Sequence, residues 1–252
     1  MDGPERMDAI VRRLREDGEV SVADLARLTG HSEMTIRRDL DRLAAQRVLR
    51  RVHGGAVSLL PRGQEPPYAV RERQSVAAKQ RIAAAVGELV ADGQAVAVDS
   101  GTTAAEVARV LGERRITAMP LSLQAAQALS VGREARILMA GGEVRPGELS
   151  FTGPLAESSL DAMRFDTVVL GCCGLSVADG ITAHDLGDVA VKRAAMRSAR
   201  RVVLAADSAK LGRVTMGYVG PVGRIDTLVT DTAAPDDIVT GIQAAGVTVL
   251  RV

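Results

Sequence analysis

The stretch SVADLARLTGHSEMTIRRDLDRLAAQRVLRRVHGGAV, residues 21–57, decides how the N-terminal part of this chain is organised. Apolar residues recur in it at helical spacing, first over 22–29 and then over 33–46, and Gly30 separates the two runs. Ser32 stands where an N-cap residue satisfies the first amide groups of a helix. The pattern predicts two helices that are joined by a tight turn.

The segments on either side complete a small domain. Upstream, residues 8–16 place apolar side chains at helical spacing and end before Gly18, which predicts a first helix. Downstream, VLRRVHGGAVSL reads as two short strands around Gly54 and Gly55. Three helices followed by a hairpin make a winged helix-turn-helix, which places its third helix in the DNA major groove. An unrelated three-helix interaction domain is the alternative with the same periodicity.

The distribution of charge indicates that the same segment binds nucleic acid. The whole chain has a net charge of only +1, but from Arg37 to Ser58 six arginines face two acids, a local balance of +4. Such a cluster favours contact with phosphates, and a solvated helix face is the alternative. Aromatic residues make up 2% of the chain and none precedes Tyr68, which argues against base stacking on single strands. We expect double-stranded DNA to be the partner.

Composition limits the class of protein. The chain has 252 residues, of which 46% are hydrophobic and 25% are charged. That length suits one large domain or two modest ones, and the composition excludes wholesale disorder and fibrous repeats. No run approaches the roughly 18 uncharged apolar residues of a membrane span, and the first residues lack the apolar stretch of a signal peptide. We therefore expect a cytoplasmic protein with no membrane partner.

After residue 58 the sequence contains two further regions, a proline-containing segment and a region of alternating strand and helix patterns. Residues 59–74 contain three prolines and few core residues, which predicts a linker. From Gln94 onward, short apolar runs such as AVAV, DTVVLG and RVVLAAD alternate with helical segments, which predicts a mainly parallel sheet with helices on both faces. The predicted fold class is α/β, with a winged helix-turn-helix domain at 1–58, the linker at 59–74 and an α/β domain at 75–252. Ligands of such sheets bind at the carboxyl ends of the strands.

Loops at those strand ends carry the candidate ligand groups. Asp99-Ser100-Gly101-Thr102-Thr103 follows one strand and precedes a helix, so its backbone amides and hydroxyls could bind an anion. A plain helix cap by Thr102 or Thr103 is the alternative. Several other strand ends add glycines, which indicates a pocket that the backbone approaches closely. These glycines are Gly141, Gly142, Gly153, Gly171 and Gly174.

The few lysines stand out, because 29 of the 32 basic residues are arginines and only Lys79, Lys192 and Lys210 remain. Asp188 lies four residues before Lys192, a spacing that allows a pair across one helical turn, either functional or an ordinary surface salt bridge. Asp207 and Lys210 share a turn after a predicted strand, for which an ordinary polar turn is the alternative.

The two cysteines, Cys172 and Cys173, are adjacent, which excludes a disulfide scaffold. A tetrahedral metal site needs about four ligands, and the three histidines lie in separate segments. We expect no metal and no cofactor, and we interpret the cysteines as small buried hydrophobes.

The motifs TIRRDL at 35–40 and LRRVHGGA at 49–56 resemble the DNA-binding domain of the DeoR family of bacterial transcriptional regulators. The resemblance implies two sets of DNA contacts. From the recognition helix these are Ser32, Thr35, Arg37 and Arg38, and from the wing Arg51, His53 and Gly54.

The C-terminal motifs DSGTT, AGGEVRPGELSFTGPLAE, GCCG, DVAVK, ADSAK and LVTD resemble the sugar-phosphate sensor domain of the same family. This implies a fold similar to ribose-5-phosphate isomerase that is used to sense a phosphorylated sugar. Two positions depart from the family pattern, with Leu121 and Asp185 where asparagine is usual. The implied pocket residues are Asp99, Ser100, Gly101, Thr102, Thr103, Gly141, Gly142, Gly171, Gly174, Lys192, Asp207 and Lys210.

The resemblance implies a repressor of carbohydrate-metabolism genes that is not an enzyme and that works as a homodimer or higher homo-oligomer on operator DNA. The alternative is an active sugar-phosphate isomerase with a DNA-binding appendage. Its base would be Asp185, Asp188 or Asp207, and its oxyanion would be stabilised by Lys192 or Lys210.

Overall fold

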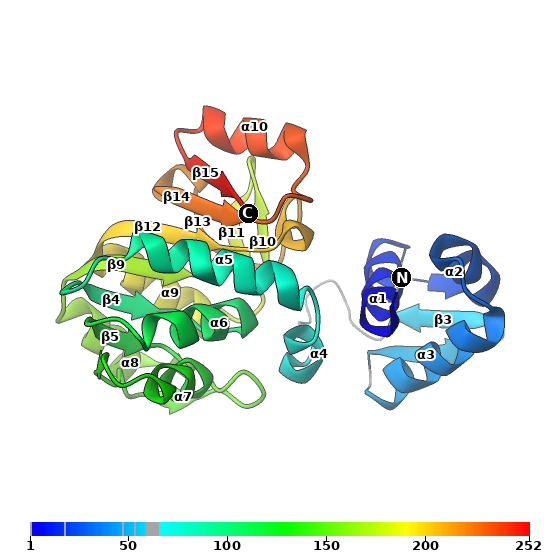
Figure 1. Ribbon diagram of the computed structural model, residues 1–252, viewed down its shortest axis with the longest axis horizontal. Coiled ribbons are helices and arrows are strands. Elements are labelled where there is room, and N and C mark those ends of the chain that lie inside the picture. The colour runs from blue at the N-terminus through cyan, green and yellow to red at the C-terminus, as the bar shows by residue number, and fades with distance from the viewer. Residues whose placement is uncertain (1, 18, 47, 53, 59–65) are drawn as a thin grey trace. The chain divides into compact units, whose positions relative to one another are not determined.

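The computed structural model describes residues 2–17, 19–46, 48–52, 54–58 and 66–252 (Figure 1). The chain divides into two compact units, Met1–Ser75 and Val76–Val252. The first is a helical domain with a small antiparallel sheet, and the second is built around a parallel sheet. The predicted fold class, α/β with an N-terminal winged helix-turn-helix, is confirmed.

The helix boundaries of the N-terminal unit follow local capping signals. The Ser21 side chain accepts a hydrogen bond from the Asp24 amide at the start of α2, and Gly30 ends that helix in the left-handed conformation with φ of 70°. Ser32 caps α3, as predicted. The elements are α1 (Gly3–Asp17), β1 (Glu19–Ser21), α2 (Val22–Thr29), α3 (Glu33–Ala45), β2 (Leu49–Val52), β3 (Gly55–Ser58) and α4 (Tyr68–Glu72).

The core of this unit is small and apolar, with Ile10, Leu25 and Leu40 fully buried on three different helices. The wing contains a strand that the sequence analysis missed, because β1 pairs with β3 to give the order β1-β3-β2. At Gly55 a Cβ atom would lie 2.1 Å from the Val20 carbonyl oxygen, so only glycine allows the two strands to approach.

The segment predicted as a linker is only partly described, since 59–65 lie outside the described residues. The remainder belongs to the first unit and contains α4. Val70 of α4 packs against the N-terminal core, and the Arg71 Nε donates a hydrogen bond of 2.9 Å to the Pro66 carbonyl.

The C-terminal unit is organised around seven strands in the order β15-β14-β12-β9-β4-β5-β6. Every neighbouring pair in this sheet is parallel, as predicted. All carboxyl ends therefore lie along one edge. The strands are β4 (Ala95–Val98), β5 (Thr117–Pro120), β6 (Arg136–Ile137), β9 (Phe165–Leu170), β12 (Ala199–Ala205), β14 (Thr227–Thr230) and β15 (Thr248–Arg251).

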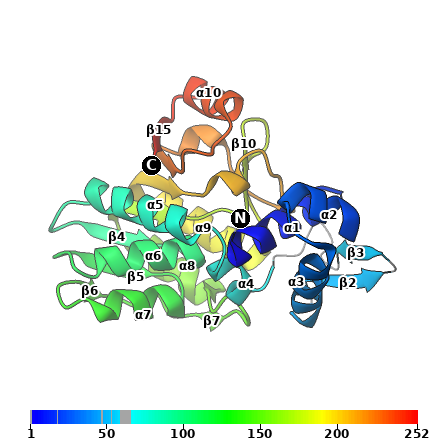
Figure 2. The same cartoon turned by 45° about the vertical axis from the view of Figure 1, so that its right-hand side comes forward.

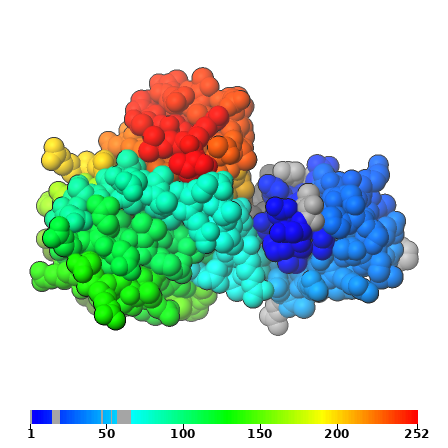
Figure 3. All heavy atoms as spheres, in the orientation of Figure 1, coloured from blue at the N-terminus to red at the C-terminus, as the bar shows by residue number. Residues whose placement is uncertain are grey.

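Helices cover both faces of this sheet (Figures 1 and 2). Side chains alternate between the faces, so Val96 and Val98 pack with α5, α6 and α7, while Ala97 packs with α8, α9 and α10. The space-filling view shows the last helix and strand as one lobe of this unit (Figure 3). The helices are α5 (Val76–Leu89), α6 (Thr102–Leu111), α7 (Leu123–Val131), α8 (Pro154–Asp161), α9 (Leu186–Ser198) and α10 (Asp236–Ala244).

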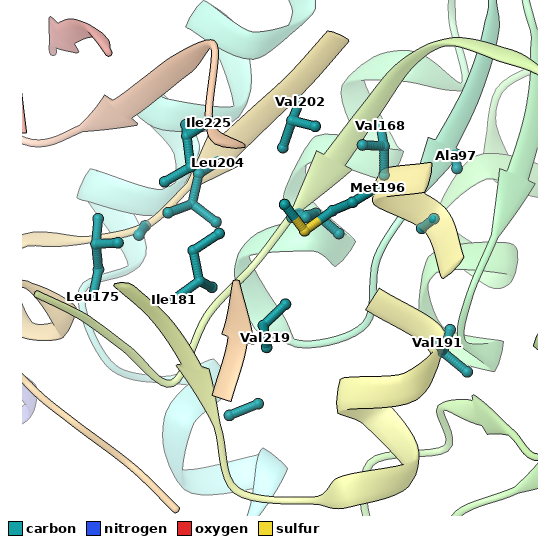
Figure 4. Packing of buried hydrophobic residues seen from close by; sticks show 14 of the residues in the cluster. Ala97, Val168, Leu175, Ile181, Val191, Met196, Val202, Leu204, Val219 and Ile225 are labelled. Atoms are coloured by element: carbon teal, nitrogen blue, oxygen red, sulfur yellow. The ribbon is translucent and has the colours of Figure 1, made fainter. Parts of the chain in front are cut away.

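A second, antiparallel sheet packs on the α9 side of the unit. Its strands are β10 (Gly174–Ser176), β11 (Gly180–Ala183) and β13 (Gly217–Gly220). They are short and glycine-rich, and for this reason they carry no recognisable strand pattern. Leu175, Ile181 and Val219 of these strands belong to the same buried cluster as Met196 of α9 (Figure 4). The remaining elements are β7 (Glu143–Val144), β8 (Phe151–Thr152), η1 (Ser208–Lys210) and η2 (Val222–Arg224).

In the described ranges, no helix combines the length and the apolar character that crossing a bilayer requires.

Candidate functional site

The third helix presents a charged surface to solvent. Ile36, Leu40 and Leu43 face the core of the N-terminal unit, so the opposite side of α3 points outward. Arg37 and Arg38 are both exposed there. Arg37 lies 3.4 Å from a Glu33 carboxylate oxygen, whereas Arg38 makes no ion pair or side-chain hydrogen bond within the described part of the chain. Arg38 is thus an available cation on this helix.

Two of the predicted DNA contacts also hold the start of the helix. The Ser32 hydroxyl accepts a hydrogen bond of 3.3 Å from the Thr35 amide, and the two hydroxyl oxygens are 3.0 Å apart. These bonds satisfy the first turn of α3. Ser32 remains exposed and Thr35 is half-buried, and both lie at the N-terminal end of the helix.

A buried ion pair fixes this helix against α1. The Arg6 Nε lies 2.5 Å from the Asp39 Oδ2, and the Asp39 side chain is only 2% exposed. The hydrogen bond that Arg6 donates to the Asp39 carboxylate raises the pKa of Arg6, and burial opposes the shift. This pair was not predicted from the sequence, although Asp39 within the apolar stripe of the helix is a signal for a buried ion pair. By holding α3 against α1, Asp39 also positions Arg37 and Arg38, which directly precede it in the helix.

The wing is joined to α3 by Arg51. Its Nε lies 3.1 Å from the Asp41 Oδ1, and its Nη1 donates a hydrogen bond of 3.0 Å to the Gly55 carbonyl. Gly54 is exposed in the turn between β2 and β3 with φ of 75°. His53, the third predicted wing contact, lies outside the described residues.

In the C-terminal unit, acidic residues follow three strands of the parallel sheet at its carboxyl edge. Asp99 follows β4, Asp207 follows β12 shortly after its last residue, and Asp231 follows β14. The Asp99 Oδ2 accepts a 2.8 Å hydrogen bond from the Gly171 amide, and the Asp231 Oδ2 accepts one of 2.7 Å from the Ser208 amide. Each of these two carboxylates thus links the end of its own strand to the end of the adjacent strand, and the carboxyl edge of the sheet is polar.

Lys192 of α9 reaches this edge. Its Nζ forms an ion pair with Asp99 and donates a 3.3 Å hydrogen bond to the Gly171 carbonyl. Both charged side chains are buried. Burial alone would lower the pKa of Lys192, but the negative charges of Asp99 and Asp188 outweigh it and raise the pKa. The expected pair with Asp188 is thus replaced by a pair with Asp99, which is much more distant in the sequence.

Asp188 is instead part of a second cluster at the start of α9. Its Oδ2 lies 2.6 Å from the Arg145 Nη2, and its Oδ1 accepts a 2.7 Å hydrogen bond from the Ser150 hydroxyl. Burial raises the pKa of Asp188, while Lys192, Ser150 and Arg145 oppose the rise. Arg145 and Ser150 were not predicted as site residues, although both lie inside the motif AGGEVRPGELS. The cluster pins that loop to α9.

Both departures from the family pattern have structural roles. The Asp185 carboxylate accepts a 3.0 Å hydrogen bond from the Asp188 amide and so caps α9, as asparagine can also do. Leu121 is 1% exposed and packs in the main core with Phe151 and Ala156. Asp185 is thus a helix cap, and Leu121 offers no polar group at this edge.

Two helices begin near this edge without a side-chain cap. Gly101 precedes α6 with φ of 97°, and Gly153 precedes α8 with φ of 85°. The alternative in which a threonine caps α6 is therefore not observed. Gly142 lies beside the start of α8, where a Cβ atom would be 3.2 Å from the Ala156 nitrogen. First-turn amides of this kind attract anions.

Of the remaining candidate pocket residues, Asp207 and Lys210 lie at the carboxyl edge of the parallel sheet, whereas Gly174 has a packing role. Asp207 accepts a 3.1 Å hydrogen bond from the Ala209 amide, and Lys210 follows in the same short helix. Burial raises the pKa of Cys172 to about 12, and the positive charges of Lys210 and Lys192 partly oppose this rise. Gly174 differs, because it packs in β10 where a Cβ atom would be 2.4 Å from the Arg213 carbonyl.

The cysteines are half-buried against the main core, and neither forms a disulfide with another described residue. Among the described side chains there is no group of three histidine, cysteine or acidic residues that could hold a metal ion.

Two family models match this chain. Residues 6–62 match the DeoR-like helix-turn-helix domain, and residues 74–232 match the DeoR C terminal sensor domain. A "HTH-type transcriptional regulator GlpR" from Haloferax volcanii is 34% identical over 98% of this chain and 96% of its own length. The "Glycerol-3-phosphate regulon repressor" of Escherichia coli K12 is 31% identical over 93% of each chain.

Solved structures give a more distant likeness. Ribose 5-phosphate isomerase A from Methanocaldococcus jannaschii is 21% identical, with a TM-score of 0.40, over 53% of each chain.

Proposed function

The chain belongs to the DeoR family of DNA-binding transcriptional regulators, and from this we propose that it represses genes of carbohydrate metabolism under the control of a phosphorylated sugar or a related metabolite. One observation carries the proposal. A single chain joins a match to the family's DNA-binding domain and a match to its sensor domain, and its relatives of almost the same length include a repressor of a glycerol 3-phosphate regulon.

The N-terminal unit would supply the DNA contacts. Its recognition helix leaves Arg38 without an intramolecular acceptor among the described residues, so this guanidinium can bind base edges or phosphates. Ser32, Thr35 and Arg37 lie at the same end of the helix and would add polar contacts. Gly54 and the predicted contact His53 belong to the wing, and Arg51 would hold that wing against the helix.

The carboxyl edge of the parallel sheet would bind the effector. A phosphate suits the first-turn amides after Gly101 and Gly153, since neither helix start is capped by a side chain. Lys210 is half-buried, and its ammonium group makes no ion pair with another described residue, so it can approach the anion. Lys192 is already neutralised by Asp99, and we infer that this pair shapes the pocket.

Control of transcription requires a difference in affinity. The effector can release the protein from operator DNA only if it binds the free conformation more tightly than the DNA-bound one. A homodimer or higher homo-oligomer would match the two-fold symmetry that operators of helix-turn-helix proteins usually have.

The isomerase alternative needs a carboxylate base that is available to take a proton. Asp185 caps α9, Asp188 is bonded by two side chains, and Asp207 caps a 3-10 helix. These structural uses favour a regulator, as do the names of the relatives.

Fluorescence anisotropy of the full-length protein tests the proposal. The probe is labelled duplex DNA from upstream of its own gene, at fixed salt, with glycerol 3-phosphate and a panel of aldose and ketose phosphates. We expect sequence-selective binding that one phosphorylated compound weakens and its unphosphorylated parent does not. Equal binding to scrambled DNA, or turnover of ribose 5-phosphate by the purified protein, would contradict the proposal.

A further inference from the structure

The recognition helix exposes an apolar side chain among its polar ones. Met34 is the second residue of α3, and it is 61% exposed, which makes it one of the more exposed large hydrophobic residues among those described. Its neighbours in the sequence, Glu33 and Thr35, are polar. Nothing in the core of the N-terminal unit requires a methionine at this position.

Helix geometry places Met34 in the same row as Arg38. Residues four apart lie on one side of a helix, one turn from each other. Ile36 and Leu40 point into the core, so the row of Met34 and Arg38 points almost directly away from it. If Arg38 is directed at DNA, Met34 is directed at the same groove one turn closer to the start of the helix.

The polar side chains beside Met34 are engaged within the helix. The Ser32 and Thr35 hydroxyls bond to each other and to the helix cap, and Arg37 lies 3.4 Å from Glu33. In the first turn of α3, Met34 is therefore an exposed apolar side chain that makes no hydrogen bond with another described residue, one turn before the exposed cation of Arg38. The N-terminal residues of a recognition helix are the ones that contact base edges.

The major groove offers one apolar group to such a side chain, the C5-methyl group of thymine. A methionine suits this contact because it is unbranched, flexible and polarizable. We propose that Met34 determines part of the operator specificity by packing against a thymine methyl group in each half-site. This inference rests on the proposed function and adds a base preference to it.

Deoxyuridine substitution tests the contact directly, because it removes only the methyl group of thymine. The preferred duplex is first selected with the full-length wild-type protein from a random library, and each thymine is then replaced in turn. We expect one position in each half-site at which deoxyuridine weakens wild-type binding by about fourfold, the effect of burying one methyl group. The Met34→Ala variant should bind the two duplexes equally, and Met34→Leu should keep the preference.

Leu28→Ala is the matched control, since Leu28 is an exposed apolar residue on α2, outside the recognition helix, and is 54% exposed. It should keep the wild-type response to deoxyuridine. The inference is overturned if no thymine is sensitive in the wild type, or if Met34→Ala keeps the same sensitivity. If the wild type selects no sequence at all, the proposed function fails and this inference fails with it. Unchanged melting temperatures of the variants would show that folding is not the cause.

Discussion

Each of the two units buries an ion pair between segments that are distant in the sequence, and the two pairs differ in their surroundings. Arg6 and Asp39 meet inside the N-terminal unit and hold α3 against α1. Lys192 and Asp99 meet at the carboxyl edge of the sheet, next to the Gly171 backbone and the open start of α6.

The difference shows how each unit can bind an anion. In the first unit the buried pair is structural, and under the proposed function the exposed arginines outside it would bind DNA. In the second unit the buried lysine is already neutralised, so the phosphate of an effector would rely on backbone amides and on Lys210. Under the proposed function, charge alone predicts the DNA surface, whereas the proposed effector site depends on backbone groups that only the fold brings together.

Removing Lys192 should give the largest effect. Lys192→Met leaves Asp99 buried without its cation, and breaking such a pair costs about 3–5 kcal/mol of unfolding free energy. Chemical denaturation of the full chain measures the loss. The double variant Lys192→Met/Asp99→Leu should recover most of it, because removing both charges is close to neutral.

The matched control is Arg197→Met, because Arg197 and Asp161 form a pair whose side chains are 54% and 52% exposed. This variant should lose no more than about 1 kcal/mol. Equal losses of unfolding free energy in the two variants would mean that burial does not make the Lys192 pair more important for stability than an exposed pair.

The other buried pair should be nearly as sensitive, but in a different unit. Asp39→Ala leaves Arg6 unpaired and should destabilise the N-terminal unit by about 3 kcal/mol, with loss of DNA binding at temperatures where that unit unfolds. Calorimetry should show a lower unfolding temperature for the N-terminal unit and an unchanged unfolding temperature for the sensor unit. The charge-exchanged variant Arg6→Asp/Asp39→Arg should regain part of the stability, and a variant that lowers both transitions equally would contradict the comparison.

An exposed arginine should affect binding and leave stability unchanged. Arg38→Ala should weaken operator binding by about 1–3 kcal/mol, because a base or phosphate contact is lost. Effector affinity of the full-length protein should stay the same. Arg27→Ala is the control, since Arg27 is an exposed residue of α2 that pairs with Asp24. A similar loss in both variants would mean that the DNA contact is not specific to α3.

The smallest effect should come from pH. Burial raises the pKa of Asp188 above its ordinary value, so the folded protein takes up this proton before the unfolded chain does. The stability of the wild type relative to Asp188→Asn should therefore rise as the pH falls from neutral towards 4, and it should be lost again as the pH rises through the folded-state pKa. Thermal melts of both proteins across this range measure it, and a difference that falls with acidification would show that the sign is wrong.

The elements that could be predicted from sequence are those with local signals. Ser21, Gly30 and Ser32 mark the ends of two helices, and the alternation of apolar runs with helical segments predicted the parallel sheet. The glycine-rich strands β10 and β11 and the short strand β1 carried too little pattern to be recognised.

The partners of the candidate site residues were harder to predict, because they are brought together by the fold. The sequence offered Asp188 as the neighbour of Lys192, since the two lie one helical turn apart. The structure instead brings Asp99 to Lys192 from a loop after β4, and Arg145 to Asp188 from a loop after β7. Spacing within one helix cannot reveal contacts between separate loops at a sheet edge.

Effector and operator binding should be linked in this protein, and reciprocal titration tests this linkage most directly. The compound that weakens operator binding is titrated by calorimetry into the free full-length protein and into the protein saturated with operator duplex. Linkage requires the same factor in both directions, so a compound that weakens operator binding tenfold must bind the operator-bound protein tenfold more weakly. Equal effector affinity for the free and the DNA-bound protein would contradict the account.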